Sequence, residues 1–173
     1  NPLPTVTAGG TATICAGSST TISGSGATTY SWDNGLGAGA TQVVSPTSTT
    51  TYTVTGTTSG CSSTSQVTVT VTPLPSVSAT GSATICAGTS VTITGAGATT
   101  YSWDNGLGAG ASQIVSPTTT TTYTVTGTTS GCTNTDAVTI TVNPTPTISV
   151  TTANNPTTCG TSTGSIQVGG SGT

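Results

Sequence analysis

Apart from its hydroxyl side chains, this 173-residue sequence offers five cysteines and three aspartates for covalent or acid–base chemistry. The sequence contains no His, Lys or Arg, so a serine or cysteine nucleophile would lack a histidine base and a phosphate would lack a cation. The aspartates are far apart in the sequence, which disfavours a carboxylate pair for glycoside hydrolysis and a calcium site. We therefore expect no enzyme activity, no catalytic, cofactor or metal site, and no nucleic-acid partner.

Four of the cysteines form two pairs with the same spacing. Cys15 and Cys61 are 46 positions apart, and so are Cys86 and Cys132. We expect one disulfide per pair, Cys15–Cys61 and Cys86–Cys132, each stabilising the fold by roughly 4 kcal/mol. Spacing alone permits three pairings of four cysteines, including a bridge between the pairs such as Cys61–Cys86, and free buried thiols are a further alternative. Since disulfides persist outside the cytoplasm, we expect an extracellular or cell-surface protein.

The cysteine spacing is part of a duplication that runs through the sequence. The segment YSWDNGLGAGA at residues 30–40 returns unchanged at residues 101–111, a shift of 71 positions. Such a period indicates a repeat architecture. It predicts two complete repeats, 1–71 and 72–142, and the start of a third, truncated β module at 143–173.

Cys159 departs from this period. The counterpart of Cys15 in the third module is position 157, which is Thr157. No cysteine follows Cys159, so we expect its partner to lie beyond Thr173 in the native protein.

Apolar and polar residues alternate in several short runs of each repeat. The run QVTVTVT at 66–72 places Val67, Val69 and Val71 on one face and threonines on the other, which is typical of a half-buried strand. Turn residues separate such runs, as expected for a sandwich of roughly six or seven short strands. We therefore predict an all-β fold of tandem immunoglobulin-like β-sandwich modules. No run of about 20 apolar residues occurs, so we expect no membrane span.

Each repeat contains a Tyr and a Trp two positions apart, namely Tyr30 with Trp32 and Tyr101 with Trp103. Residues two apart share one face of a strand. A buried Trp on the third strand packs the core of immunoglobulin-like sandwiches, so we interpret these four as core aromatics. Stacking of the indoles on a sugar is the alternative interpretation.

An Asn-Gly pair follows each aromatic pair, at Asn34–Gly35 and at Asn105–Gly106. Asn and Gly tolerate the positive φ angles of tight hairpin turns, so we predict a hairpin turn at each position. The alternative is a calcium or sugar ligand that uses the preceding aspartate, Asp33 or Asp104, but one carboxylate beside each turn is few for calcium.

The sequence also lacks the residues that usually keep strand edges from pairing between molecules. No Lys is present, and strands such as residues 66–72 are uncharged and rich in β-branched residues. We therefore expect self-association, with copies of the chain or neighbouring modules covering these edges. The threonine cluster at 118–122 is a candidate for O-linked glycans or, alternatively, a solvated strand face.

The segments ICAG, GATTYSWDNG, SPTTTTTYTVTGT and VTITVNPTP together resemble the tandem immunoglobulin-like and PKD-like repeats of Bacteroidota cell-surface proteins. The tail TTCGTSTGSIQVGGSGT is similar to the opening of the repeats in gliding-motility adhesins of the same phylum. The resemblance implies export by the type IX secretion system and a role as a stalk, adhesin or filament.

The leading functional hypothesis is therefore structural. We expect an extracellular repeat protein whose disulfide-stapled modules form a cell-surface stalk or filament. The alternative hypothesis is an adhesin whose modules bind surface glycans through the Tyr, the Trp and the Asp-Asn-Gly loop.

Overall fold

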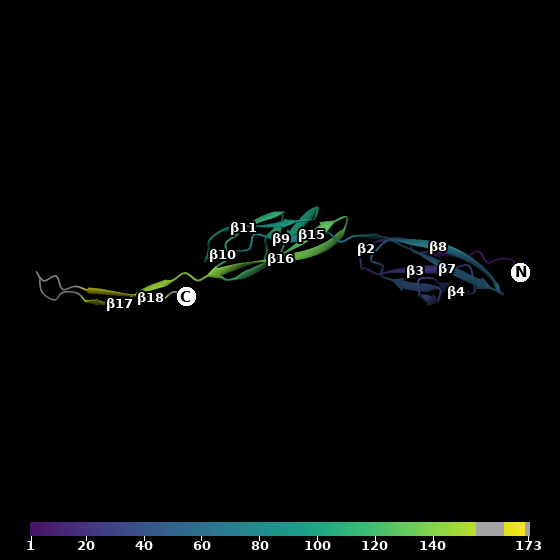
Figure 1. The fold of residues 1–173 in the computed structure, drawn as a ribbon, viewed down its shortest axis with the longest axis horizontal. Helices are drawn as coiled ribbons and strands as arrows, with labels where there is room; N and C mark the ends of the chain where they lie inside the picture. Colours follow the sequence, from purple (N-terminus) through teal and green to yellow (C-terminus); the bar gives the residue numbers. More distant parts are fainter. Residues whose placement is uncertain (155–164, 172–173) are drawn as a thin grey trace, which may run out of the picture. The chain divides into compact units, whose positions relative to one another are not determined.

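The computed structural model describes residues 1–154 and 165–171, which form strands and turns without any helix (Figure 1). The chain divides into two compact units. The first unit contains Asn1–Ser76 and Thr128–Asn134, and the second contains Val77–Gly127 and Thr135–Thr173. A short segment of the second repeat, Thr128–Asn134, therefore belongs to the first unit.

The first repeat consists of two sheets. One sheet has three strands in the order β1 (Thr7–Gly9), β3 (Thr20–Ser25) and β6 (Thr41–Val44). The other has five strands in the order β2 (Ala12–Cys15), β8 (Cys61–Thr72), β7 (Thr50–Thr58), β4 (Thr29–Trp32) and β5 (Gly37–Ala38).

The second repeat has the same topology. Its three-stranded sheet has the order β14 (Ser112–Val115), β11 (Val91–Ala96) and β9 (Ser78–Thr80). Its five-stranded sheet has the order β10 (Ala83–Cys86), β16 (Cys132–Asn143), β15 (Thr121–Thr129), β12 (Thr100–Trp103) and β13 (Gly108–Ala109).

Alternating apolar residues of the two sheets form one core in each repeat. On β8, Val67 and Val69 are buried while Thr70 is exposed, because successive side chains of a strand point to opposite faces. The core of the first repeat contains Val6, Ile22, Trp32, Val44, Tyr52, Val54, Val67 and Val69. The core of the second contains Ile93, Trp103, Val115, Tyr123, Val125, Val138 and Ile140.

The strand order within each repeat is that of an immunoglobulin-like sandwich. β4, β7 and β8 correspond to the C, F and G strands, and β1, β3 and β6 correspond to A, B and E. The expected fold class, all-β with tandem immunoglobulin-like β-sandwiches, is thus confirmed. No cysteine lies on β3 or β7, so the bridge that joins strands B and F in antibody domains has no counterpart in this repeat.

Each repeat contains one parallel strand pairing, between the strand that ends in its first cysteine and the strand that begins with its second. β2 runs parallel to β8, with Ala12 opposite Val69 and Cys15 opposite Thr72. β10 runs parallel to β16 in the same register, with Cys86 opposite Asn143. These two pairings determine where the cysteines lie.

Strands β17 (Thr147–Asn154) and β18 (Ser165–Ser171) form a separate antiparallel hairpin. Its apolar side chains are largely exposed, as shown by Ile148, Val150, Ile166 and Val168. The assignment of residues 143–173 to a third module stays a prediction.

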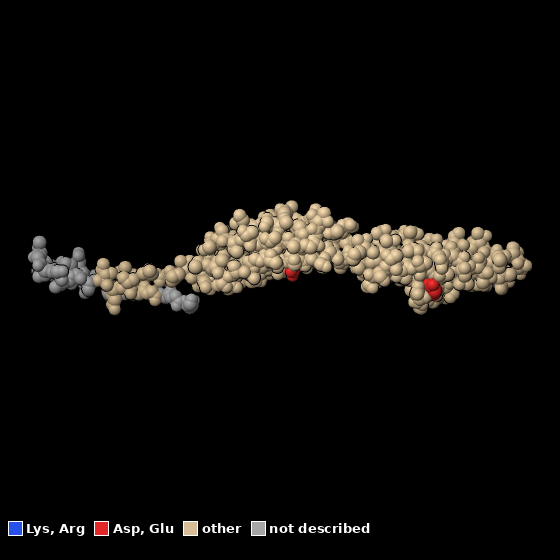
Figure 2. Space-filling view, turned by 45° about the horizontal axis from the view of Figure 1, so that its top comes forward, with Lys and Arg blue, Asp and Glu red and all other residues tan. Residues whose placement is uncertain are grey.

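The surface carries almost no charge. Figure 2 shows isolated red carboxylates on an otherwise uncharged surface, in keeping with three acidic residues and no Lys or Arg in the sequence. The described residues include no helix with the length and hydropathy that crossing a membrane requires. They also include no group of three or more metal-binding side chains.

Candidate functional site

A disulfide between successive repeats is the main candidate for a functional feature. It joins Cys15, the last residue of β2, to Cys132, the first residue of β16, over a sequence separation of 117. The two Cα atoms are 5.6 Å apart, a separation that a disulfide bridges without moving the backbone. Both cysteines lie in the first unit, because the segment Thr128–Asn134 belongs to it.

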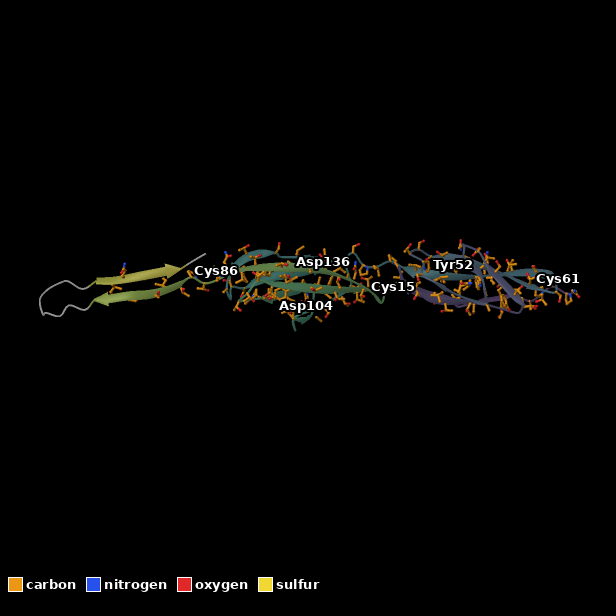
Figure 3. The ribbon with its side chains drawn as sticks, turned by 90° about the horizontal axis from the view of Figure 1, so that it is seen from below. Cys15, Tyr52, Cys61, Cys86, Asp104 and Asp136 are labelled. Atoms are coloured by element: carbon orange, nitrogen blue, oxygen red, sulfur yellow. A yellow bond between two sulfur atoms is a disulfide. The ribbon has the colours of Figure 1, made fainter. Side chains whose placement is uncertain are left out.

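The expected pairings Cys15–Cys61 and Cys86–Cys132 are therefore wrong. Cys15 lies opposite Thr72 at the end of β8, whereas Cys61 begins that strand. A strand of 12 residues separates its ends by roughly 36 Å at about 3.3 Å per residue, and a disulfide needs Cα atoms within about 7 Å. Figure 3 shows Cys15 and Cys61 at opposite ends of the first unit.

The same register separates the second expected pair. Cys86 lies opposite Asn143, the last residue of β16, and Cys132 is the first residue of that strand. The parallel pairing thus prevents a disulfide within either repeat. It leaves one cysteine at each end of each repeat.

Backbone atoms of both partners surround the disulfide. The Sγ of Cys15 lies 4.0 Å from the carbonyl oxygen of Gly131, and the Sγ of Cys132 lies 4.0 Å from that of Thr72. The Nδ2 of Asn134 donates a hydrogen bond of 3.0 Å to the carbonyl oxygen of Pro75. Cys132 is only 2% exposed, so the bond is largely shielded on that side.

Two further cysteines in the described part of the chain are free thiols. Cys61 is half-buried and Cys86 is exposed. The Sγ of Cys61 lies 3.6 Å from the carbonyl oxygen of Asn1, the residue that precedes Thr72 by one repeat. The expectation for Cys159 lies outside the described residues.

The duplicated loop after the aromatic pair is a tight turn. Asn34 and Gly35 have φ angles of 53° and 75°, and Asn105 and Gly106 have 52° and 76°. Positive φ at both central residues is the requirement of a type I′ hairpin turn. The N–H of Leu36 closes the first turn with a hydrogen bond of 3.1 Å to the carbonyl oxygen of Asp33.

The aspartate of this turn has a structural role that sequence reasoning missed. The Oδ1 of Asp33 accepts hydrogen bonds from the N–H of Thr53, at 2.9 Å, and from the Nδ2 of Asn34, at 3.2 Å. Asp104 accepts the same bonds in the second repeat, where the N–H of Thr124 donates at 2.9 Å. The carboxylate therefore links the turn to a neighbouring strand, which is β7 in the first repeat and β15 in the second. No sequence signal for this contact exists apart from the identity of the two copies.

The aromatic pairs lie in or against the cores. Trp32 and Trp103 are each 4% exposed, and their Nε1–H groups donate bonds of 3.0 Å to the carbonyl oxygens of Gly39 and Gly110. The hydroxyl of Tyr30 donates a hydrogen bond of 2.7 Å to the carbonyl oxygen of Ala27 and accepts one of 2.8 Å from the N–H of Ala27. Tyr101 makes the equivalent bonds. Buried, bonded indoles offer no face to a sugar.

A surface hollow of about 300 Å³ lies beside the Tyr30 ring. The half-buried side of Tyr30 is the one aromatic surface in its lining. The lining residues are Thr28, Thr29, Tyr30, Ala38, Gly39 and Ala40.

The two repeats differ in one polar contact between their sheets. In the first, the hydroxyl of Ser65 accepts a bond of 3.1 Å from the N–H of Ala8. In the second, the carboxylate of Asp136 accepts the equivalent bond, at 2.7 Å, from the N–H of Ala79. The N–H groups of Ala79 and, second, of Ala137 lower the pKa of Asp136 below its ordinary value, because they stabilise the charged form.

No protein-family model matches the sequence, and neither does any curated protein.

The solved structures that resemble the chain are tandem immunoglobulin domains. The insect immune protein hemolin is 17% identical with a TM-score of 0.45, and the match covers 82% of this chain and 47% of that one. The eight N-terminal immunoglobulin domains of DSCAM are 12% identical with a TM-score of 0.40, and the match covers 85% of this chain and 28% of that one. Domains 3–5 of Drosophila OTK are 15% identical with a TM-score of 0.39, and the match covers 82% of this chain and 60% of that one. The chain spans less than half the length of the hemolin and DSCAM chains.

Proposed function

We propose that the chain is part of an extracellular stalk or filament in which immunoglobulin-like repeats are joined to their neighbours by disulfides. The observation that carries the proposal is the bond between Cys15 and Cys132. In the 71-residue period, these cysteines belong to two different repeats, 1–71 and 72–142. A bond across repeats limits their relative motion, which is what a stalk under load requires.

The uncharged strand edges support lateral contacts as well. β6 and β14 each form one edge of a three-stranded sheet, and each presents one apolar side chain to solvent. Val43 is 68% exposed and Ile114 is 73% exposed, at equivalent places in the two repeats. Exposed, uncharged edge strands are templates for pairing between molecules, so neighbouring copies or modules would cover them.

The cellular setting follows from the same features. A disulfide is stable in an oxidising compartment, which supports an extracellular or cell-surface location. The resemblance to Bacteroidota surface repeats supports a PKD-like, gliding-adhesin-related origin and type IX secretion. Residues 143–173 are, on this proposal, the opening of a third module.

Electron microscopy of the purified, non-reduced protein tests the stalk. We expect rods or filaments, and we expect Val43→Lys together with Ile114→Lys to shorten or abolish lateral bundles, because charge on an edge strand prevents pairing. Micrographs with only separate, flexible beads would contradict the proposal. Thr21→Lys with Thr92→Lys, which places the same charges at exposed positions of inner strands, is the matched control.

An adhesin that binds surface glycans is the second candidate, and the hollow beside Tyr30 is the observation that favours it. Ala38→Trp would fill this hollow, since Ala38 is exposed in its lining. A glycan array probed with the wild type and with this variant would support adhesion if bound signals disappear in the variant. Ala109→Trp changes the same place in the second repeat and shows whether both copies contribute.

A further inference from the structure

The disulfide opens a covalent path along the chain that is much shorter than the sequence. Cys15 and Cys132 are bonded over a sequence separation of 117, so residues 16–131 form a closed loop. A chain cannot be drawn longer than its shortest covalent path. Tension applied at any residue before Cys15 and at any residue after Cys132 therefore passes through the two sulfur atoms and bypasses the loop.

We propose that the Cys15–Cys132 bond turns residues 6–15 and 132–143 into a strap that carries tension, limits the length of the chain under load and keeps both repeats folded. The inference deepens the proposed function, on which it rests, because it names the part of the stalk that carries the load.

The strap consists mainly of strands that are already extended. Before the bond it contains β1 and β2, and after the bond it contains β16, which runs for 12 residues from Cys132 to Asn143 (Figure 1). A strand rises about 3.3 Å per residue, and a fully drawn chain spans at most about 3.6 Å per residue. Tension can therefore lengthen each of these strands by only about a tenth.

The loop contains the length that tension would otherwise release. All strands from β3 to β15 lie inside it. Antiparallel pairs such as β7 with β8, where Thr58 lies opposite Cys61, fold the chain back on itself. A separation of 117 residues corresponds to about 400 Å of fully drawn chain at roughly 3.3–3.6 Å per residue. The bond withholds this length from the load.

Each repeat begins and ends its share of the loop beside the bond. Ala16, the first residue of the loop, donates its N–H to the carbonyl oxygen of Thr72 at 2.9 Å. Asn134, on the strap, donates to the carbonyl oxygen of Pro75 at 3.0 Å. Thr72 and Pro75 lie in the middle of the loop, at the end of the first repeat and the start of the second. The peptide connection between the repeats is therefore also bypassed.

Side chains of the strap belong to both cores. Val6 is buried in the core of the first repeat, and Val138 and Ile140 on β16 are buried in the core of the second. β16 lies between β10 and β15 in its sheet, so it has a neighbouring strand on each side. Tension between the two ends of β16 acts along the strand and does not pull it out of the sheet. The core of the second repeat thus keeps the side chains that the strap supplies.

The link in the strap is sheltered from reductants. Cys132 is 2% exposed and Cys15 is half-buried. Thiol–disulfide exchange requires access of a thiolate to one of the two sulfur atoms. Burial therefore favours a lasting bond, which a load-bearing link requires.

Stretching single molecules of the full chain in optical tweezers tests the inference. Residues with an azide side chain replace Leu3, which is 70% exposed, and Thr145, which is also exposed. DNA handles are attached to the two azides, so that the load enters before the strap and leaves after it. Residues 146–173 remain in the chain but lie off the path of the load.

Two chains with the same number of substitutions are compared. The bonded chain carries Cys61→Ser, Cys86→Ser and Cys159→Ser, which leave only the Cys15–Cys132 pair. The unbonded chain carries Cys15→Ser, Cys132→Ser and Cys159→Ser, which leave only the two thiols that are free in the structure. Intact mass confirms the bond or the thiols, and circular dichroism confirms the strand content of both chains.

We expect the bonded chain to reach at most about 100 Å between the handles and to follow the same curve on release. The unbonded chain should reach about 500 Å, in steps as its repeats unfold. A chain that fails to fold would reach the same drawn length, so poor folding of the variant does not obscure the result. A phosphine reductant added to the bonded chain under constant load should release the missing length of about 400 Å.

Lengthening of the bonded chain by a whole repeat, about 240 Å, would overturn the inference. An unbonded chain that stays as short as the bonded chain at every load would also overturn it, because the repeats would then need no strap. So would different curves for stretching and release of the bonded chain, since the strap would then leave the cores. Filaments from a chain that fails these tests would leave the proposed function intact, whereas a short bonded chain that forms only separate beads would support the strap and contradict the filament.

Discussion

The hairpin tips of the two repeats have the same turn but differ in their covalent state. Cys132 at the second tip is bonded and 2% exposed, whereas Cys61 at the first tip is a half-buried free thiol. The two tips have equivalent places in the sequence period, begin equivalent strands, and have the same positive φ angles in the turn before the cysteine. The difference shows that a single repeat does not contain both partners of a disulfide. The bond forms only where a neighbouring repeat supplies the second cysteine.

The largest effect should come from removing the bonded cysteine. Cys132→Ser opens a loop whose ends are 117 positions apart, and closing a loop of about 100 residues stabilises a fold by about 4.7 kcal/mol on the chain-entropy model. We expect Cys132→Ser to lower the free energy of unfolding by roughly that amount, and Cys61→Ser to leave it nearly unchanged. Denaturant unfolding of the two variants, each in monomeric form, measures this difference. Equal losses would show that the tips do not differ.

The next effect tests what the repeats share, namely their cores. Trp32 and Trp103 have equal burial and equal hydrogen bonds, so Trp32→Ala and Trp103→Ala should each cost about 4 kcal/mol. Each variant retains a single Trp, and its fluorescence reports unfolding of the other repeat. We expect the reporter repeat to stay folded in both variants. A large asymmetry between the two costs would mean that the cores are not equivalent.

A smaller effect isolates the backbone of the tips. A Cβ added at Gly60 or at Gly131 meets nothing within 4 Å, and both residues have positive φ angles. Gly60→Ala and Gly131→Ala should therefore each cost about 1–2 kcal/mol from left-handed strain alone. Thermal unfolding of both variants measures this cost. A clearly greater loss for Gly131→Ala would reveal strain at the disulfide that the free tip lacks.

The smallest effect concerns the hydrogen bond that Asp136 accepts in the second repeat and Ser65 accepts in the first. The pKa of Asp136 is lowered in the folded state by the N–H of Ala79 and, second, by that of Ala137. Its stabilising contribution is therefore present above the unfolded-state pKa of about 3.9 and is lost as the pH falls through the folded-state pKa. Ser65 makes the equivalent contact without a charge.

We expect acid to loosen the second repeat before the first. Asp136→Ser, which installs the residue of the first repeat, should remove this difference. Tyr123 and Tyr52 are equivalent core residues, and their ring resonances in nuclear magnetic resonance spectra report on the two repeats separately. An unchanged difference in the variant would show that another group is responsible.

The sequence is sufficient to predict the sandwich but not the cysteine pairing. Val67 and Val69 alternate with threonines, and alternation indicates which side chains of a strand face the core whatever its neighbours are. Pairing depends on strand direction. Cys15 ends β2 and Cys61 begins β8, so antiparallel strands would place the two side by side, whereas the parallel register places them a full strand apart.

The role of Asp33 was hidden for a similar reason. Its partner, the N–H of Thr53, is 20 positions away and is brought to the turn by the pairing of β4 with β7. Local spacing describes the turn at Asn34–Gly35 but carries no information about a contact made across the sheet.

Peptide mapping of the non-reduced protein tests the central claim most directly. After free thiols are alkylated, cleavage before Asp33, Asp104 and Asp136 gives the peptides 1–32, 33–103, 104–135 and 136–173. The Cys15–Cys132 bond predicts a two-peptide species that joins 1–32 to 104–135, with alkylated Cys61 and Cys86 in 33–103 of the monomer. A three-peptide species that joins 1–32, 33–103 and 104–135 would mean that the bonds lie within the repeats, and would contradict the account.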